Sequence, residues 1–234
     1  MRAMITMIRK ALLPLLSAGA LLTATVGLAT AGDAQDQMVE KAKITVDTLA
    51  GQSDMAQFRK LLAVSKGVVV FPQVLKAGFF VGGAGGSGVL LGKDAAGNWS
   101  SPAFYTMGQG SIGLQFGAEA KELVLVIMTE KGLQAMIDNK VKLGGDLSAA
   151  VGPVGTTIGA ASSTNINVDV FSFANSKGLF IGASVEGSIL APKDDWNDAY
   201  YGKPTTTQAI VINRTAVNPQ ADGLRAALRA AEAK

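Results

Sequence analysis

Apolar side chains recur at helical spacing near both ends of the chain. Over residues 33–50 they form one stripe with members three or four positions apart, namely Met38, Ala42, Val46 and Leu49. Such spacing places apolar side chains on one face of a helix, with the polar residues on the other. Similar patterns predict further helices over residues 53–66, 130–139, 194–201, 205–213 and 218–234.

Between these segments the pattern changes to short apolar runs bounded by turn residues, which is typical of β-strands. Pro72 is expected to close the first strand, and the glycine cluster 82–88 to separate two others. The run 123–128 is apolar on both faces, which indicates a central strand. A turn is predicted over 94–98, and the expected strands are 68–71, 77–81, 89–92, 99–105, 111–118, 122–129, 146–151, 165–174 and 178–190.

This order of elements predicts an α+β fold. Strands without regular intervening helices form a mainly antiparallel sheet, here with N-terminal and C-terminal helices. Glycines inside several strand-like runs, such as Gly78, Gly82 and Gly113, weaken a strand unless a bend or close backbone approach requires them. Gly82 and Gly86 are expected to serve backbone curvature. We therefore expect a strongly coiled, glycine-rich sheet that is partly closed like a barrel.

The first 31 residues have the layout of a secretory signal peptide. Three basic residues precede an almost wholly apolar stretch, 11–28, and the small residues Ala29 and Ala31 stand just before Gly32. An uncleaved membrane anchor is the alternative, but the small-residue exit favours cleavage after Ala31. We thus expect an exported protein, periplasmic or extracellular and peripheral on a membrane. Residues 32–234 would form one domain ending in a helix at about 218–234.

Charge and composition exclude several classes of function. The net charge of +3 resides in the predicted leader, and the remaining residues carry equal numbers of basic and acidic groups. This balance argues against nucleic-acid binding, which relies on clustered Lys and Arg. The chain has no histidine and no cysteine. The usual general base, the thiolate nucleophile and the common transition-metal ligands are therefore missing. We expect no catalytic residues, no metal site and no cofactor.

Two motifs are typical of ligand-binding sites, but the residues around each of them do not fit such a site. The spacing Gly83-x-Gly85-x-x-Gly88 matches a dinucleotide fingerprint, but strand-like residues follow where that motif needs a helix. Asp194, Asp195 and Asp198 could face a cation. We interpret them as acids near a helix N-terminus, where the helix dipole favours negative charge.

A series of short motifs appears in the order found in the SYLF family. These motifs are 76–79, 82–89, 99–103, 117–119, 143–148, 152–155, 176–180, 187–188 and 200–202. The chain resembles this family over roughly residues 40–213, which is nearly all of the expected domain. The ordered set is more specific than any single motif.

The resemblance implies a non-catalytic, lipid-binding protein that acts at membrane surfaces of the cell envelope. The alternative is a structural or protein-interaction module with incidental lipid binding. Family members bind phosphoinositides through an N-terminal amphipathic segment, and some act with actin. Expected partners here are an anionic phospholipid or membrane surface, or another envelope protein, whereas export argues against actin. Whether the N-terminal helix packs on the sheet or inserts into lipid stays open. The candidate lipid-binding residues are Lys41, Lys43, Leu49, Arg59, Lys60 and Lys76.

Overall fold

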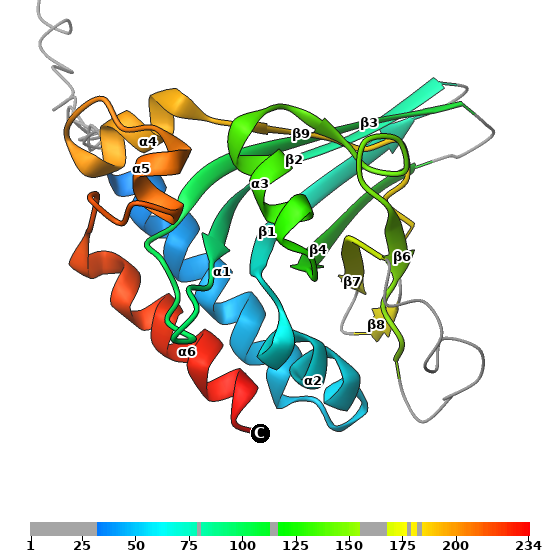
Figure 1. The fold of residues 1–234 in the computed structure, drawn as a ribbon. Helices are drawn as coiled ribbons and strands as arrows, with labels where there is room; N and C mark the ends of the chain where they lie inside the picture. Colours follow the sequence, from blue (N-terminus) through cyan, green and yellow to red (C-terminus); the bar gives the residue numbers. More distant parts are fainter. Residues whose placement is uncertain (1–31, 79–80, 113–116, 155–167, 177–178, 182–183) are drawn as a thin grey trace, which may run out of the picture.

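The computed structural model describes residues 32–78, 81–112, 117–154, 168–176, 179–181 and 184–234 (Figure 1). The predicted signal peptide lies outside these residues. Six α-helices are present in the described part, with 3₁₀ turns at Ser53–Met55 and Pro219–Ala221. They are α1 (Asp33–Gly51), α2 (Ala56–Val64), α3 (Glu130–Asp138), α4 (Asp194–Tyr201), α5 (Thr207–Val211) and α6 (Asp222–Glu232). All the predicted helices are therefore present, within a few residues at their ends.

Nine strands in the described residues form one curled sheet, as Figure 1 shows. The order is β5-β9-β3-β2-β1-β4-β7-β6, with β8 paired to β7, and β6–β7 is the one parallel pair among them. This confirms the predicted α+β fold with a mainly antiparallel, coiled sheet. The strands are β1 (Gly67–Gly78), β2 (Val81–Gly92), β3 (Ala103–Ile112), β4 (Gly117–Ile127), β5 (Val141–Lys142), β6 (Ala149–Val151), β7 (Val170–Ser176), β8 (Leu179–Ile181) and β9 (Ile189–Pro192).

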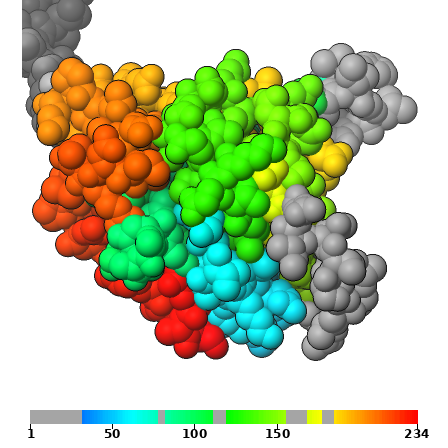
Figure 2. All heavy atoms as spheres, in the orientation of Figure 1, coloured from blue at the N-terminus to red at the C-terminus, as the bar shows by residue number. Residues whose placement is uncertain are grey.

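Helices cover both faces of the sheet, so the protein has two apolar layers. On one face, here called the α3 face, Val69 and Leu125 pack with side chains of α3 and α5. On the other, the α1 face, Val70 and Val124 pack with α1, α2, α4 and α6. In the space-filling view, the green atoms of α3 and its neighbouring residues lie at the centre of the visible face (Figure 2). Because β4 lies between β1 and β7, and its residues 123–127 are buried with side chains in both apolar layers, the prediction of a central strand is confirmed.

The first strand does not end at Pro72. It continues to Gly78 through a bulge, in which Pro72 and Gln73 face the single residue Glu122 of β4. A bulge leaves its extra residue outside the regular ladder, so the missing N–H of proline costs little there. The prediction that Pro72 closes the strand is therefore wrong.

The glycine cluster is part of a strand and not a loop. Gly83, Gly85 and Gly88 all lie in β2, which pairs with β3 throughout the cluster and with β1 as far as Gly85, where the bulge of β1 interrupts the register. The dinucleotide fingerprint therefore has no helix behind its third glycine, as its strand-like context predicted. An ideal Cβ on Gly86 would lie 2.3 Å from the carbonyl oxygen of Gln73. Glycine is thus needed where the bulge of β1 presses against β2.

Other strand boundaries also differ from the prediction. The expected strand 111–118 joins the end of β3 to the start of β4, and 113–116 lie outside the described residues. The expected strand 178–190 is replaced by the separate strands β8 and β9. The ends of these strands are set by pairing with distant segments of the chain, and the local pattern of apolar residues contains no information about that pairing.

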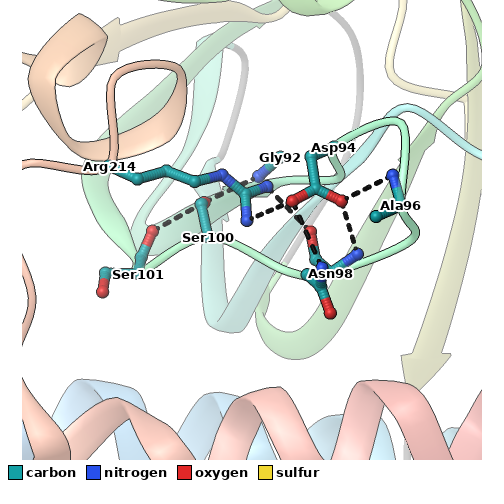
Figure 3. Close-up of polar contacts among 7 residues, drawn as sticks. All are labelled: Gly92, Asp94, Ala96, Asn98, Ser100, Ser101 and Arg214. Carbon is teal, nitrogen blue, oxygen red and sulfur yellow. Dashed lines mark hydrogen bonds and ion pairs between the residues drawn. The ribbon is translucent and has the colours of Figure 1, made fainter.

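The predicted turn at 94–98 connects β2 to β3 and is fastened to the C-terminal part of the chain (Figure 3). Asp94 Oδ1 accepts hydrogen bonds from the backbone nitrogens of Ala96 and Asn98, at 3.0 and 2.8 Å. Arg214, which has a left-handed φ of 55°, places Nη1 2.9 Å from Asp94 Oδ2 and donates to the Asn98 carbonyl. These contacts hold the pKa of Asp94 below its usual value, with the hydrogen bond from the Asn98 backbone as the largest cause.

Among the helices that the structure describes, none has the length and apolar content needed to cross a membrane.

Candidate functional site

A groove of about 520 Å³ lies between α1 and the part of the sheet where β1 bulges. Lys41, Ile44, Thr45 and Thr48 line it from the helix, and β1, β4 and β7 supply the rest: Pro72, Gln73, Ala120, Lys121, Glu122 and Asn175. Its volume falls in the range of small-molecule sites. The bulge residues Pro72 and Gln73, which face Glu122 of β4, form part of its wall.

Glu122 is held firmly in the wall of the groove. Thr45 Oγ1 donates to Glu122 Oε1 at 2.9 Å, and Asn175 Nδ2 donates to Glu122 Oε2 at 2.6 Å. A carboxylate only accepts hydrogen bonds, so the amide nitrogen of Asn175 must face it. Within the described residues, Glu122 forms no ion pair. The groove therefore contains a fixed carboxylate without a cationic partner there.

The helix side of the groove combines a cation with apolar surface. Lys41 is exposed and forms no ion pair among the described residues. Ile44 is 50% exposed, and Leu75, paired with Ala120 of the groove, is 56% exposed. Lys41 precedes Thr45 by one helical turn, so the two side chains project from the same face of α1. The site offers an ammonium group, a carboxylate and accessible apolar side chains within one hollow.

The other predicted lipid-binding residues on or beside α1 have structural contacts. Lys43 pairs with Asp47 at 3.0 Å and lies beside Gly223 of α6. Leu49 is 1% exposed, in the apolar layer between α1 and the sheet. Arg59 donates from Nη1 to the carbonyl oxygens at positions 50 and 52, at 3.1 and 2.7 Å, which satisfies the end of α1. The helix therefore packs on the sheet, and Leu49 cannot contact lipid unless α1 detaches.

Lys60 and Lys76 do not line the groove. Lys60 is exposed on α2, while Lys76 is half-buried on β1 opposite Glu119 of β4. Of the six predicted residues, the groove brings in Lys41 alone. The lipid-binding role of all six stays a prediction.

Sequence reasoning missed Glu122, Asn175 and Thr45. Glu122 stands at the head of an apolar run, and the two others have ordinary strand and helix surroundings. Only the register Glu122↔Asn175 and the packing of α1 bring the three together. No local signal in the chain could have identified them.

A second hollow, of about 510 Å³, lies at the start of α3. Its lining includes Thr129, Lys131 and Ser148 around the buried Asp169, together with Gly144, Gly145 and Asp146. Burial by itself would raise the pKa of Asp169, but hydrogen bonds from Thr129 and Ser148 and the ammonium of Lys131 keep it below its usual value. The Asp169 carboxylate thus serves to join the α3 N-terminus to the strand region around Ser148.

Among the described residues, neither hollow contains a cluster of metal-ligating side chains. The groove can therefore hold a polar or charged ligand by hydrogen bonds, charge and apolar contact.

Comparison with known proteins identifies the family. The model of the family Ysc84, described as "Las17-binding protein actin regulator", matches residues 108–231, more than half of the chain. The chain belongs to the Ysc84 family. This confirms the resemblance to SYLF domains, which are the same family.

Individual relatives support the assignment. Protein YSC84 of Saccharomyces cerevisiae is 35% identical over 167 residues, which cover 70% of this chain and 36% of that protein. SH3 domain-containing YSC84-like protein 1 of Homo sapiens is 31% identical over 165 residues, which cover 70% of this chain and 48% of that protein. LAS seventeen-binding protein 3 of Saccharomyces cerevisiae is 33% identical over 167 residues. The chain thus spans less than half the length of these relatives.

These findings correct one prediction. We expected export to argue against actin as a partner. The family is described as an actin regulator, and relatives are named for binding Las17, so that expectation is wrong.

Proposed function

We propose that this Ysc84-family chain is a non-catalytic module that binds anionic phospholipid at a membrane surface through the groove beside α1. The observation that carries the proposal is the exposed ammonium of Lys41 next to the half-exposed Ile44 in one groove. A cation near an anionic surface and an apolar side chain reaching the acyl boundary are the two terms that hold peripheral proteins on membranes. Because Ala42, Val46 and Leu49 of the apolar stripe are buried, the exposed side of α1 carries the binding.

Vesicle co-sedimentation with Lys41→Glu tests this function. One lysine near an anionic surface contributes about 1 kcal/mol, so reversing its charge should weaken binding to phosphatidylglycerol vesicles about tenfold or more. Added salt should weaken wild-type binding, since the charge term is screened. Lys140→Glu is the matched control, because Lys140 is exposed after α3, on the opposite face of the sheet. Equal binding by wild type and both variants would remove the groove from the function.

A protein-docking module is the second candidate function. The family model covers residues 108–231 and so includes α6 but not α1, which favours a role for the C-terminal half in the partner binding named for the relatives. Co-sedimentation with actin filaments is its direct test. If the chain pellets with filaments but not with vesicles, protein docking replaces lipid binding.

Export to a cell envelope is a further part of the proposal. It rests on the basic, apolar and small-residue order of positions 1–31. Intact-mass analysis of the native protein tests it, with a chain beginning at Gly32 as the expected result and retention of residues 1–31 as the contrary one.

A further inference from the structure

The groove contains a carboxylate that anionic lipid binding does not use. Glu122 is held by Thr45 and Asn175, and no basic side chain of the described residues pairs with it. A negative charge in the wall of a groove repels a simple anionic headgroup. A ligand that covers Glu122 without pairing with it removes water from the carboxylate, and this desolvation weakens binding. A ligand that brings its own cation gains a charge-assisted hydrogen bond instead.

Lys41 and Glu122 lie on opposite walls of the groove. Lys121 also lines it, but it directly precedes Glu122 on β4, where successive side chains point to opposite faces of the sheet. Lys41 projects from α1, and Glu122 belongs to β4, with the Thr45 hydroxyl joining helix and strand one helical turn further on. Lys41 and Glu122 do not approach within the 4.0 Å of an ion pair. A bound group can therefore lie between them, with a negative end toward Lys41 and a positive end toward Glu122.

From this arrangement we infer that the groove selects aminophospholipid headgroups, in which an ammonium group is joined by a two-carbon arm to the phosphate. The phosphate accepts from the Lys41 ammonium, the headgroup ammonium donates to Glu122, and Ile44 contacts the glycerol and acyl part. Phosphatidylserine meets all three requirements and keeps the net negative charge that steers binding. This inference rests on the proposed function and adds the headgroup class and Glu122 as the residue that determines specificity.

The test compares vesicles of equal surface charge. Phosphatidylcholine vesicles carry either phosphatidylserine or phosphatidylglycerol at the same mole fraction, so that only the headgroup ammonium and its neighbours differ. The intact protein should bind the phosphatidylserine vesicles about tenfold more tightly, the size expected of one hydrogen bond between charged groups. Glu122→Gln preserves the shape: its oxygen can still accept from Asn175 Nδ2, and its amide nitrogen can donate to the Thr45 hydroxyl. It should remove the preference and strengthen phosphatidylglycerol binding, because a charge that repels the anionic headgroup is gone.

Glu119→Gln is the matched control. Glu119 is an exposed carboxylate three positions earlier on β4 and faces the other side of the sheet, so the preference should survive. Soluble O-phosphoserine distinguishes a membrane headgroup from a free phosphorylated amine. As a competitor it should displace the protein from vesicles only weakly, because it has no apolar part to contact Ile44.

Each result has a defined meaning. Equal wild-type binding to both vesicles overturns the headgroup inference and leaves the proposed function standing. A preference that persists in Glu122→Gln, or tight binding of soluble O-phosphoserine without vesicles, also overturns it. Failure to bind either vesicle refutes the proposed function, and the inference with it. The wild-type comparison needs no variant, so the inference is tested even if Glu122→Gln does not fold.

Discussion

Replacing Gly86 with alanine should destabilise the protein, because the bulge of β1 leaves no space for a Cβ. An ideal Cβ on Gly86 would lie 2.3 Å from the Gln73 carbonyl oxygen and 3.3 Å from Val74 Cα. Both contacts are with backbone, which cannot rotate away as a side chain can. Relief therefore requires the two strands to separate locally at a bulge that is fixed on both sides by the ladders to β2 and β4.

Overpacking of this kind typically costs about 1–3 kcal/mol. In a domain of this size, a loss of about 2 kcal/mol lowers Tm by roughly 4–8 °C. Gly83→Ala is the matched control on the same strand, because its Cβ would meet Gln109 O at an ordinary 3.6 Å. That change should be neutral or mildly stabilising, since alanine restricts the unfolded chain.

Thermal unfolding followed by circular dichroism distinguishes the two variants. If Gly86→Ala melts within about one degree of Gly83→Ala, where a difference of several degrees is expected, the close-approach argument fails. Gly86→Ala should also weaken vesicle binding, because the displaced Gln73 lines the groove. The role of Gly82 in curvature stays a prediction.

Two further predictions concern charged groups inside the fold. Lys93 Nζ lies 2.9 Å from Glu232 Oε1, with side chains only 8% and 20% exposed. Lys93→Met should therefore cost about 3 kcal/mol in urea unfolding, because it leaves the Glu232 carboxylate uncompensated and removes the hydrogen bonds from Lys93 to the carbonyl oxygens of Leu62 and Ala63. Adding Glu232→Gln should recover the part that comes from the charge. Asp169 has a pKa below its usual value, so its carboxylate stabilises the folded state above about pH 4, and this stability is lost as the pH falls through the folded-state pKa. Asp169→Asn should lower the urea midpoint at pH 7, and the midpoint should then depend less on pH below about 4. If the variant shows the same pH dependence as the wild type, the hydrogen bonds from Thr129 and Ser148 do not favour the charged form of Asp169.

The sequence by itself determined the local elements and the family. Helix α1 and the central strand β4 were both recognisable because helical and strand periodicities are written in neighbouring residues. The ordered motifs identified the family for a similar reason, since each motif is a run of adjacent residues and needs no tertiary contact to be recognised. The absence of histidine and cysteine limited the available chemistry in the same way, since it depends on composition alone.

Only the tertiary structure decided where β1 ends, which face of α1 is free, and what lines the groove. Pro72 looked like the end of a strand, but pairing on both sides carries β1 past it through a bulge. Leu49 and Ile44 are both apolar residues of one helix, yet packing buries the first and leaves the second half exposed. Glu122 gained a site only because the register with Asn175 and the docking of α1 bring distant residues together. Such contacts depend on the pairing of residues that are far apart in the sequence. The periodicity of apolar residues shows only which face of a single helix or strand is apolar, and not which other element packs against it.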